Sequence, residues 1–157
     1  MDLPGAPEPY AERLRSVLSA AVGLGITADF EEDELPTDGV PDWFVAACSQ
    51  DGDGAPDFAR SGRAAYQAYT GSRPWSLQDW LYRFDPADGS RGWEWWDITR
   101  AGPSRARIWV DSWGESFFGC QELRWAAYTA GALRIGGPAV RRFDMWVSEA
   151  VTEAHQG

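Results

Sequence analysis

The segment from residue 93 to residue 113 constrains the fold more than any other part of the chain. It contains five of the ten tryptophans, in two runs, WEWWDITR (93–100) and RARIWVDSW (105–113), separated by the turn-forming AGPS. Aromatic and β-branched residues at this density are typical of strands, and the short turn indicates an antiparallel pair. Together with the preceding run WLYRFD (80–85), the segment predicts a three-stranded antiparallel meander over about residues 80–113.

Apolar residues at helical spacing flank this predicted sheet on both sides in the sequence. Helices are predicted at residues 8–22, ended by Gly23 and Gly25, at 42–48, from a cap at Asp57 to Gly71, at 116–131, and from Pro138 onward. In the last two, the residues expected to face inward are Phe117, Cys120, Leu123, Ala127 and Ala130, and then Val140, Phe143, Val147, Val151 and Ala154. Helices before and after an antiparallel sheet predict an α+β fold. At 157 residues the chain is expected to form one domain, 1–157.

The predicted strands have two different faces, because side chains alternate across a strand. Ala106, Ile108 and Val110 form an ordinary core face. If that face packs on the helix at 116–131, the opposite face presents Trp93, Trp95, Asp97, Arg107, Trp109, Asp111 and Trp113. Tryptophan and arginine are enriched at binding hot spots, so this set predicts a binding patch. The alternative is that the N-terminal helices cover this face and the indole N–H groups bond to the two aspartates inside a two-sided core.

Residues 26–42 are a second candidate surface, an acidic loop or linker within the domain. The run DFEEDELPTDGVPD (29–42) has seven acidic residues, no basic residue and two prolines. The candidate contacts in it are Glu31, Glu32, Asp33 and Glu34. One interpretation is a docking strip for a basic partner. The other is a solvated linker that keeps the protein soluble, which is how charge runs usually behave.

The overall charge restricts the classes of partner. The formal net charge is −10, and all 14 basic residues are arginine. Such a chain repels nucleic acid and anionic membrane surfaces and attracts basic proteins. No run approaches the ~20 apolar residues of a membrane span, and the N-terminus has no export-signal pattern. We therefore expect a cytoplasmic protein without a nucleic-acid or membrane partner, and the absence of Lys and Asn indicates a GC-rich bacterial source.

Residues for most catalytic and metal sites are missing from the sequence. His155 is the only histidine, which excludes Ser/His/Asp, Cys/His and multi-histidine metal sites. The glycines follow no nucleotide-binding pattern, and DGDG (51–54) lacks the carboxylates that complete a calcium loop. No cofactor and no metal are therefore expected. Cys48 and Cys120 lie in apolar runs and are expected to be buried thiols rather than a disulfide.

These features favour a non-catalytic protein-binding module. The best match is a small cytosolic inhibitor of the immunity or antitoxin type, acting on a basic bacterial toxin. The alternative is a small enzyme or ligand-binding protein that uses Asp97, Asp111 and Arg107, beside aromatic rings, on a sugar or another polar metabolite. A third hypothesis is a homodimer formed through the tryptophan face.

Overall fold

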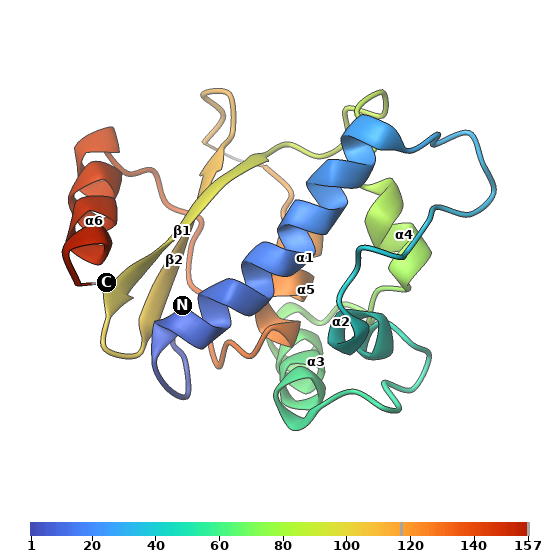
Figure 1. Ribbon diagram of the computed structural model, residues 1–157, viewed down its shortest axis with the longest axis horizontal. Coiled ribbons are helices and arrows are strands. Elements are labelled where there is room, and N and C mark those ends of the chain that lie inside the picture. Colours follow the sequence, from blue (N-terminus) through green and yellow to red (C-terminus); the bar gives the residue numbers. More distant parts are fainter. Residues whose placement is uncertain (117, 157) are drawn as a thin grey trace.

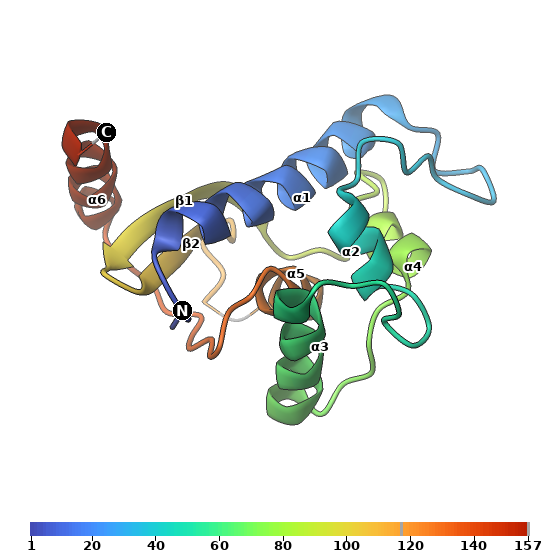
Figure 2. The same ribbon diagram turned by 60° about the horizontal axis from the view of Figure 1, so that its bottom comes forward.

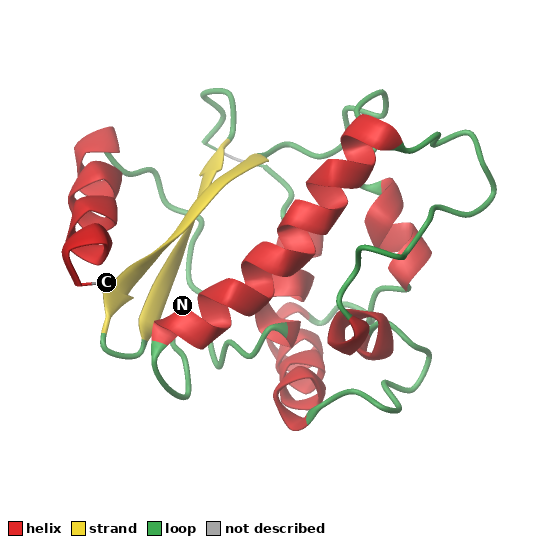
Figure 3. Ribbon diagram, viewed as in Figure 1, coloured by secondary structure: helices red, strands yellow, loops and turns green. Residues whose placement is uncertain are grey.

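The structure, a computed structural model that describes residues 1–116 and 118–156, combines six helices with two antiparallel strands in that part of the chain (Figures 1 and 3). In chain order these are α1 (Pro7–Thr27), α2 (Asp42–Ala47), α3 (Asp57–Thr70), α4 (Leu77–Tyr82), β1 (Glu94–Gly102), β2 (Arg105–Asp111), α5 (Gln121–Thr129) and α6 (Phe143–Gln156). The α+β prediction is confirmed, but the described residues form a two-stranded sheet instead of the three-stranded meander. None of the described helices is long and apolar enough to cross a membrane.

The hairpin of β1 and β2 lies between helices on two sides (Figures 1 and 2). Helix α1 contacts both strands from one side, and α6 contacts β1 from the other. Helices α2, α3 and α4 lie at the far end of the molecule from α6. The core is enclosed by α1, α5 and the inner face of the hairpin, where Leu14, Leu18, Ile98, Trp125 and Ala126 are fully buried. Helix α6 remains outside this core.

The run WLYRFD (80–85), predicted as the first strand, forms the second half of helix α4 and the turn that follows it. Ser76 caps this helix, because its hydroxyl oxygen accepts a hydrogen bond from the backbone N–H of Asp79 at 3.2 Å. Trp80 and Phe84 are four residues apart and both buried, and their ring centroids are 4.8 Å apart. The cap and the helical spacing of these aromatic residues therefore outweigh the strand-like composition.

Helix α1 continues to Thr27, past both glycines that were expected to end it. Gly25 lies close to the chain after α4, since a Cβ at this position would be 3.1 Å from the carbonyl oxygen of Phe84. Glycine here permits close packing instead of ending the helix. The other helix predictions in this half are better: the run 42–48 is helical as α2, and Gly71 ends α3 in the left-handed conformation, with φ of 68°.

Helices α3 and α5 touch at Gly62 with almost no space between their backbones. A Cβ on Gly62 would lie 1.8 Å from the carbonyl oxygen of Tyr128. Only glycine allows this approach, so Gly62 sets the separation of the two helices. Asp57, predicted as the cap of α3, is instead its first helical residue and pairs with Arg60.

Helix α5 begins at Gln121, later than the predicted residue 116. The chain before it is not helical, because Cys120 has φ of −143° and Phe118 packs closely against Gly92, where a Cβ would be 3.0 Å from the Phe118 Cβ. Once the helix has started, its predicted inward residues Leu123, Ala127 and Ala130 are buried. The predicted inward residue Phe117 lies outside the described residues.

Helix α6 begins at Phe143 instead of near Pro138, and it does not bury the stripe predicted for it. Phe143, Val147 and Val151 are 59%, 38% and 50% exposed. At 3.6 residues per turn, the centre of this stripe lies nearly half a turn from Glu149, which faces the sheet. The apolar stripe of α6 is therefore on the solvent side, and the helix contacts β1 through a mostly polar face.

Candidate functional site

A β-bulge at Trp96 divides the predicted binding patch. In the pairing of β1 with β2, Trp95 lies opposite Val110 and Asp97 lies opposite Trp109, so Trp96 is an extra residue on β1. An extra residue in one strand reverses the alternation of side chains beyond it. Residues before the bulge therefore point to the opposite face from the one that simple alternation predicts.

Trp93 and Trp95 consequently belong to the core. Trp93 is fully buried, and Trp95 packs partly buried against the core residues. The Trp93 indole Nε1 donates a 2.6 Å hydrogen bond to the carboxylate of Glu122, which is also buried. Arg83 Nε lies 3.6 Å from the other oxygen of that carboxylate and supplies the compensating charge. The prediction that Trp93 and Trp95 share a face with Asp97 is wrong.

The face that does carry Asp97, Arg107 and Trp109 is covered by α6. Trp146 donates from its indole Nε1 to Asp97 at 2.8 Å, and Glu149 forms an ion pair with Arg107. Trp109 is half-buried beneath this contact. The C-terminal helix thus covers the face, whereas the alternative considered from the sequence was a cover of N-terminal helices.

Thr99 and Trp96, which sequence reasoning left out of the site, connect the hairpin to α6. The Thr99 hydroxyl accepts a 2.7 Å hydrogen bond from Trp109 Nε1 and donates one of 2.6 Å to Glu149. Trp96 packs against the aromatic ring of Trp146, with centroids 4.9 Å apart. The bulge brings Trp96 to this side, so no alternating pattern could have placed it here.

Asp111 and Trp113 lie at the open end of the hairpin, opposite its turn and away from α6. Both are exposed, Trp113 to 61%, and the Asp111 carboxylate accepts a 2.8 Å hydrogen bond from the backbone N–H of Trp113. The structure therefore does not bring Asp111 together with Asp97, whose carboxylate is bonded to Trp146. The residues of the predicted patch are divided among the core, the α6 contact and the hairpin end.

Replacing Glu149 by glutamine is expected to loosen α6 without unfolding the core. The substitution removes the charge that pairs with Arg107 and weakens the bond from Thr99, and charge-assisted hydrogen bonds are the stronger ones. Amide hydrogen exchange in α6 should become roughly tenfold faster, while exchange in α1 stays unchanged. Asp144→Asn is the matched control, because among the described residues Asp144 pairs only with the nearby Arg142. Equal acceleration in both variants would contradict the assigned contact.

The acidic loop between α1 and α2 is anchored to the body of the protein. The side chain of Gln78 on α4 accepts a 2.9 Å hydrogen bond from the Leu35 N–H and donates one of 3.1 Å to the Leu35 carbonyl oxygen. The hydroxyl of Tyr82, also on α4, donates to the carbonyl oxygen of Glu32. The side chains of Leu35 and Val40 are buried in the core. Helix α4 therefore holds the loop in one conformation.

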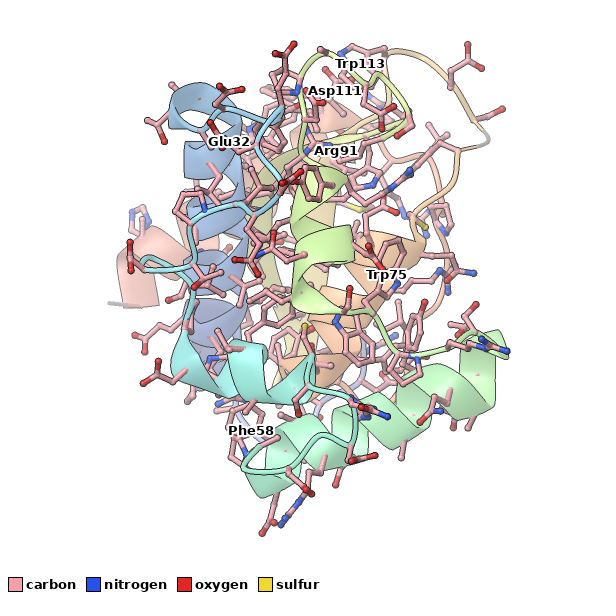
Figure 4. All side chains as sticks on the ribbon, turned by 90° about the vertical axis from the view of Figure 1, so that its right-hand side faces the viewer. Glu32, Phe58, Trp75, Arg91, Asp111 and Trp113 are labelled. Atoms are coloured by element: carbon pink, nitrogen blue, oxygen red, sulfur yellow. The ribbon has the colours of Figure 1, made fainter. Side chains whose placement is uncertain are left out.

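The carboxylates of this loop point into solvent. The side chains of Glu31, Glu32, Asp33 and Glu34 are all exposed. None of the ion pairs among residues 1–116 and 118–156 involves a carboxylate from residues 29–42. Figure 4 shows Glu32 toward the same end of the molecule as Asp111 and Trp113. In Figure 1 the segment after α4 lies between the acidic loop and the loop that follows β2. This end of the protein thus presents exposed carboxylates from separate segments.

A groove of about 680 Å³ runs beside β2, between this strand, α5 and the segment that leads to α6. Ile108 and Val110 of β2 line it together with Leu123 and Ala127 of α5. Arg107 and Asp111 also line the groove, but Asp97 does not. The three polar residues of the proposed ligand site therefore do not all line this groove.

The two cysteines are free and differ in burial. Burial raises the pKa of the Cys48 thiol to about 12, whereas Cys120 is half-buried and lines the groove. Because the thiolate is the nucleophile, iodoacetamide near pH 8 should modify Cys120 in the folded protein and spare Cys48. In denaturant both should react. The variants Cys48→Ala and Cys120→Ala assign the modified sites by mass spectrometry, and rapid native labelling of the Cys120→Ala variant would contradict this.

The described residues contain no group of three or more His, Cys, Asp or Glu side chains placed to hold a metal ion. His155 is exposed on α6, where its ring Nδ1 lies 2.8 Å from the carbonyl oxygen of Val151. Comparison of the chain with protein-family models, with curated proteins and with solved structures finds no match. Two surfaces of the protein are candidates for its function, the anchored acidic loop and the groove beside β2.

Proposed function

We propose that this chain is a non-catalytic protein-binding module whose partner is a basic protein that docks on the acidic loop. An inhibitor of the immunity or antitoxin type, directed against a basic bacterial toxin, fits this description. The observation that carries the proposal is the fixed loop, whose carboxylates form no ion pair with a described residue. Its anchors are Leu35, which bonds to Gln78, and Val40 in the core.

Two physical arguments support this function. A loop that is already ordered loses little conformational entropy when a partner binds, so more of the interaction energy appears as affinity. Carboxylates without internal partners keep their full attraction for lysine and arginine on another protein. The net charge of −10 adds long-range steering that speeds the encounter of the two proteins.

The test compares two variants that lose the same charge at different places. The loop variant carries Glu31→Gln, Asp33→Asn and Glu34→Gln. The control variant carries Glu12→Gln, Asp51→Asn and Asp53→Asn, which are also exposed. Each tagged protein is incubated with extract of the source organism, and stoichiometric partners are identified and their affinities measured.

We expect a basic partner that binds the wild-type chain and the control variant equally. The loop variant should bind it at least about tenfold more weakly, and the difference should shrink as salt is added. The proposal fails if no stoichiometric basic partner is found, or if the loop variant binds it as tightly as the control variant does.

A further inference from the structure

Among the described residues, the outer edge of β2 is paired only near its start, by the first residues of the chain. Met1 and Ala106 exchange two backbone hydrogen bonds, at 2.7 and 3.1 Å. Asp2 bridges Arg105 on one side and Arg134 on the other, both in antiparallel fashion. Residues 1–3 therefore lie extended between β2 and the segment that follows α5, joined to both by isolated β-bridges at Asp2.

Beyond Ala106, the same edge of β2 faces the groove. Alternate residues of a strand point their N–H and C=O groups to the same edge, so Ile108 and Val110 point theirs where Ala106 does. No backbone hydrogen bond in the described part of the chain joins Ile108 or Val110 to a neighbour on this edge. An open edge of this kind is a template for an additional strand. The segment between α5 and α6, which forms the other wall, runs alongside β2 in Figure 1.

The groove has an apolar floor and a basic rim. Ile108, Val110 and Leu123 are part of the floor. The charged lining residues are Arg105, Arg107, Arg124, Arg134 and Arg141, against Asp2, Asp111 and Glu115. Five arginines against three acidic residues is the reverse of the balance in the whole chain, which has a net charge of −10.

The arginines of the rim act on one another. Burial lowers the pKa of Arg107, and repulsion from Arg141 and Arg105 lowers it further. The side chains of Arg124 and Arg141 donate to backbone carbonyl oxygens of Gly137 and Val140, and neither forms an ion pair with a described residue. Positive charge at the rim is thus available to an incoming anionic group.

We propose that the groove binds an acidic, extended segment of a partner protein, which adds to the edge of β2 as a strand beside Ile108 and Val110. Alternate side chains of such a segment point to the floor and to the rim, so the matching chemistry is apolar and acidic residues in alternation. This surface takes the opposite charge from the acidic loop, and the site is independent of the function proposed above.

The first test uses a short fluorescein-labelled peptide of alternating glutamate and valine, blocked at both ends, and measures its binding to the full chain by fluorescence anisotropy. We expect saturable binding that weakens with salt. A peptide with the same residues in separate glutamate and valine blocks should bind at least about tenfold more weakly. An unlabelled peptide of alternating lysine and valine should not displace the labelled peptide from the groove.

The second test removes the backbone pairing. Two versions of the alternating peptide carry methyl groups on every second backbone nitrogen, one on the odd and one on the even positions. The version whose methyl groups replace the N–H groups facing β2 should bind about tenfold more weakly or worse. Val110→Pro removes an N–H that points to the open edge, a position where strands tolerate proline, and should have a similar effect. If this variant fails to fold by circular dichroism, the methylated peptides with the wild-type protein decide the question.

The third test separates local from overall charge. Arg141→Glu should weaken binding of the alternating peptide about tenfold, whereas Arg73→Glu, which changes the net charge equally at an exposed site outside the groove, should not. The peptide should also protect Cys120, which lines the groove, from alkylation.

The proposal is overturned if the alternating peptide does not bind, or if it binds no better than the block or methylated peptides. Equal effects of Arg141→Glu and Arg73→Glu would also overturn it. The acidic-loop variant keeps the groove intact and should bind the peptide at least as well as the wild-type chain, so the two proposed sites succeed or fail separately.

Discussion

Substitution of Gly62 by alanine is expected to lower the free energy of unfolding by about 3 kcal/mol or more, a large effect for one methyl group. The added Cβ would lie 1.8 Å from the carbonyl oxygen of Tyr128 and 2.8 Å from the Cα of Thr129. Both are backbone atoms of α5, so only a movement of α5 away from α3 relieves the clash. Because α5 also carries the fully buried Trp125, that movement would open the core.

The control for Gly62 is Gly23, a second glycine inside a helix. A Cβ at Gly23 would meet no atom within 4 Å. Gly23→Ala should therefore follow intrinsic helix propensity and stabilise the protein by up to about 1 kcal/mol. Urea denaturation with a constant m-value measures both variants. Effects of the same sign and size would show that the contact between α3 and α5 is not tight.

The second large effect is expected at Glu122, the buried carboxylate between the hairpin and α4. Glu122→Leu should cost about 3 kcal/mol, because it leaves a buried arginine nitrogen of Arg83 without its counter-charge and the Trp93 N–H without an acceptor. Glu122→Gln keeps an oxygen that can accept from Trp93, so its cost should be smaller, about 1–2 kcal/mol. Thermal and urea unfolding give both values.

A double-mutant cycle identifies the partner responsible for the loss. Trp93→Phe removes the indole donor, so the cost of Glu122→Leu should be smaller in that background than in the wild type. The same holds for Arg83→Met, which removes the charge. If the costs were simply additive in both cycles, Glu122 would not be coupled to either residue, and the described cluster would have no energetic role.

Much of the helical structure could be predicted from local patterns. Gly71, for example, ends α3 where a residue with positive φ is needed. Helix α4 departs from its local composition: the aromatic residues of WLYRFD predict a strand, but the cap at Ser76 starts a helix. Gly25 could not be interpreted from local patterns. It lets the backbone at Phe84, which is distant in sequence, pack closely against α1.

The candidate site was harder to predict, for two physical reasons. Alternation assigns faces correctly only while each residue on one strand has one partner on the other, and Trp96 breaks this condition. The groove beside β2 is lined by segments far apart in sequence, from Met1 to Arg141. Its basic rim is invisible in an overall charge of −10. By contrast, the acidic loop is contiguous in sequence, so its exposed carboxylates could be recognised directly.

The bulge at Trp96 shifts the alternation of inward and outward side chains along β1 by one residue. A mutational scan should find the intolerant positions at Trp93 and Trp95, then again at Ile98, with the even spacing interrupted once. Deletion of Trp96 would remove the bulge, leave Asp97 opposite Trp109 on the side of α6, and remove the ring that packs against Trp146. The extra residue thus gives α6 a second contact on this strand, next to Asp97, without changing which residues face the interior.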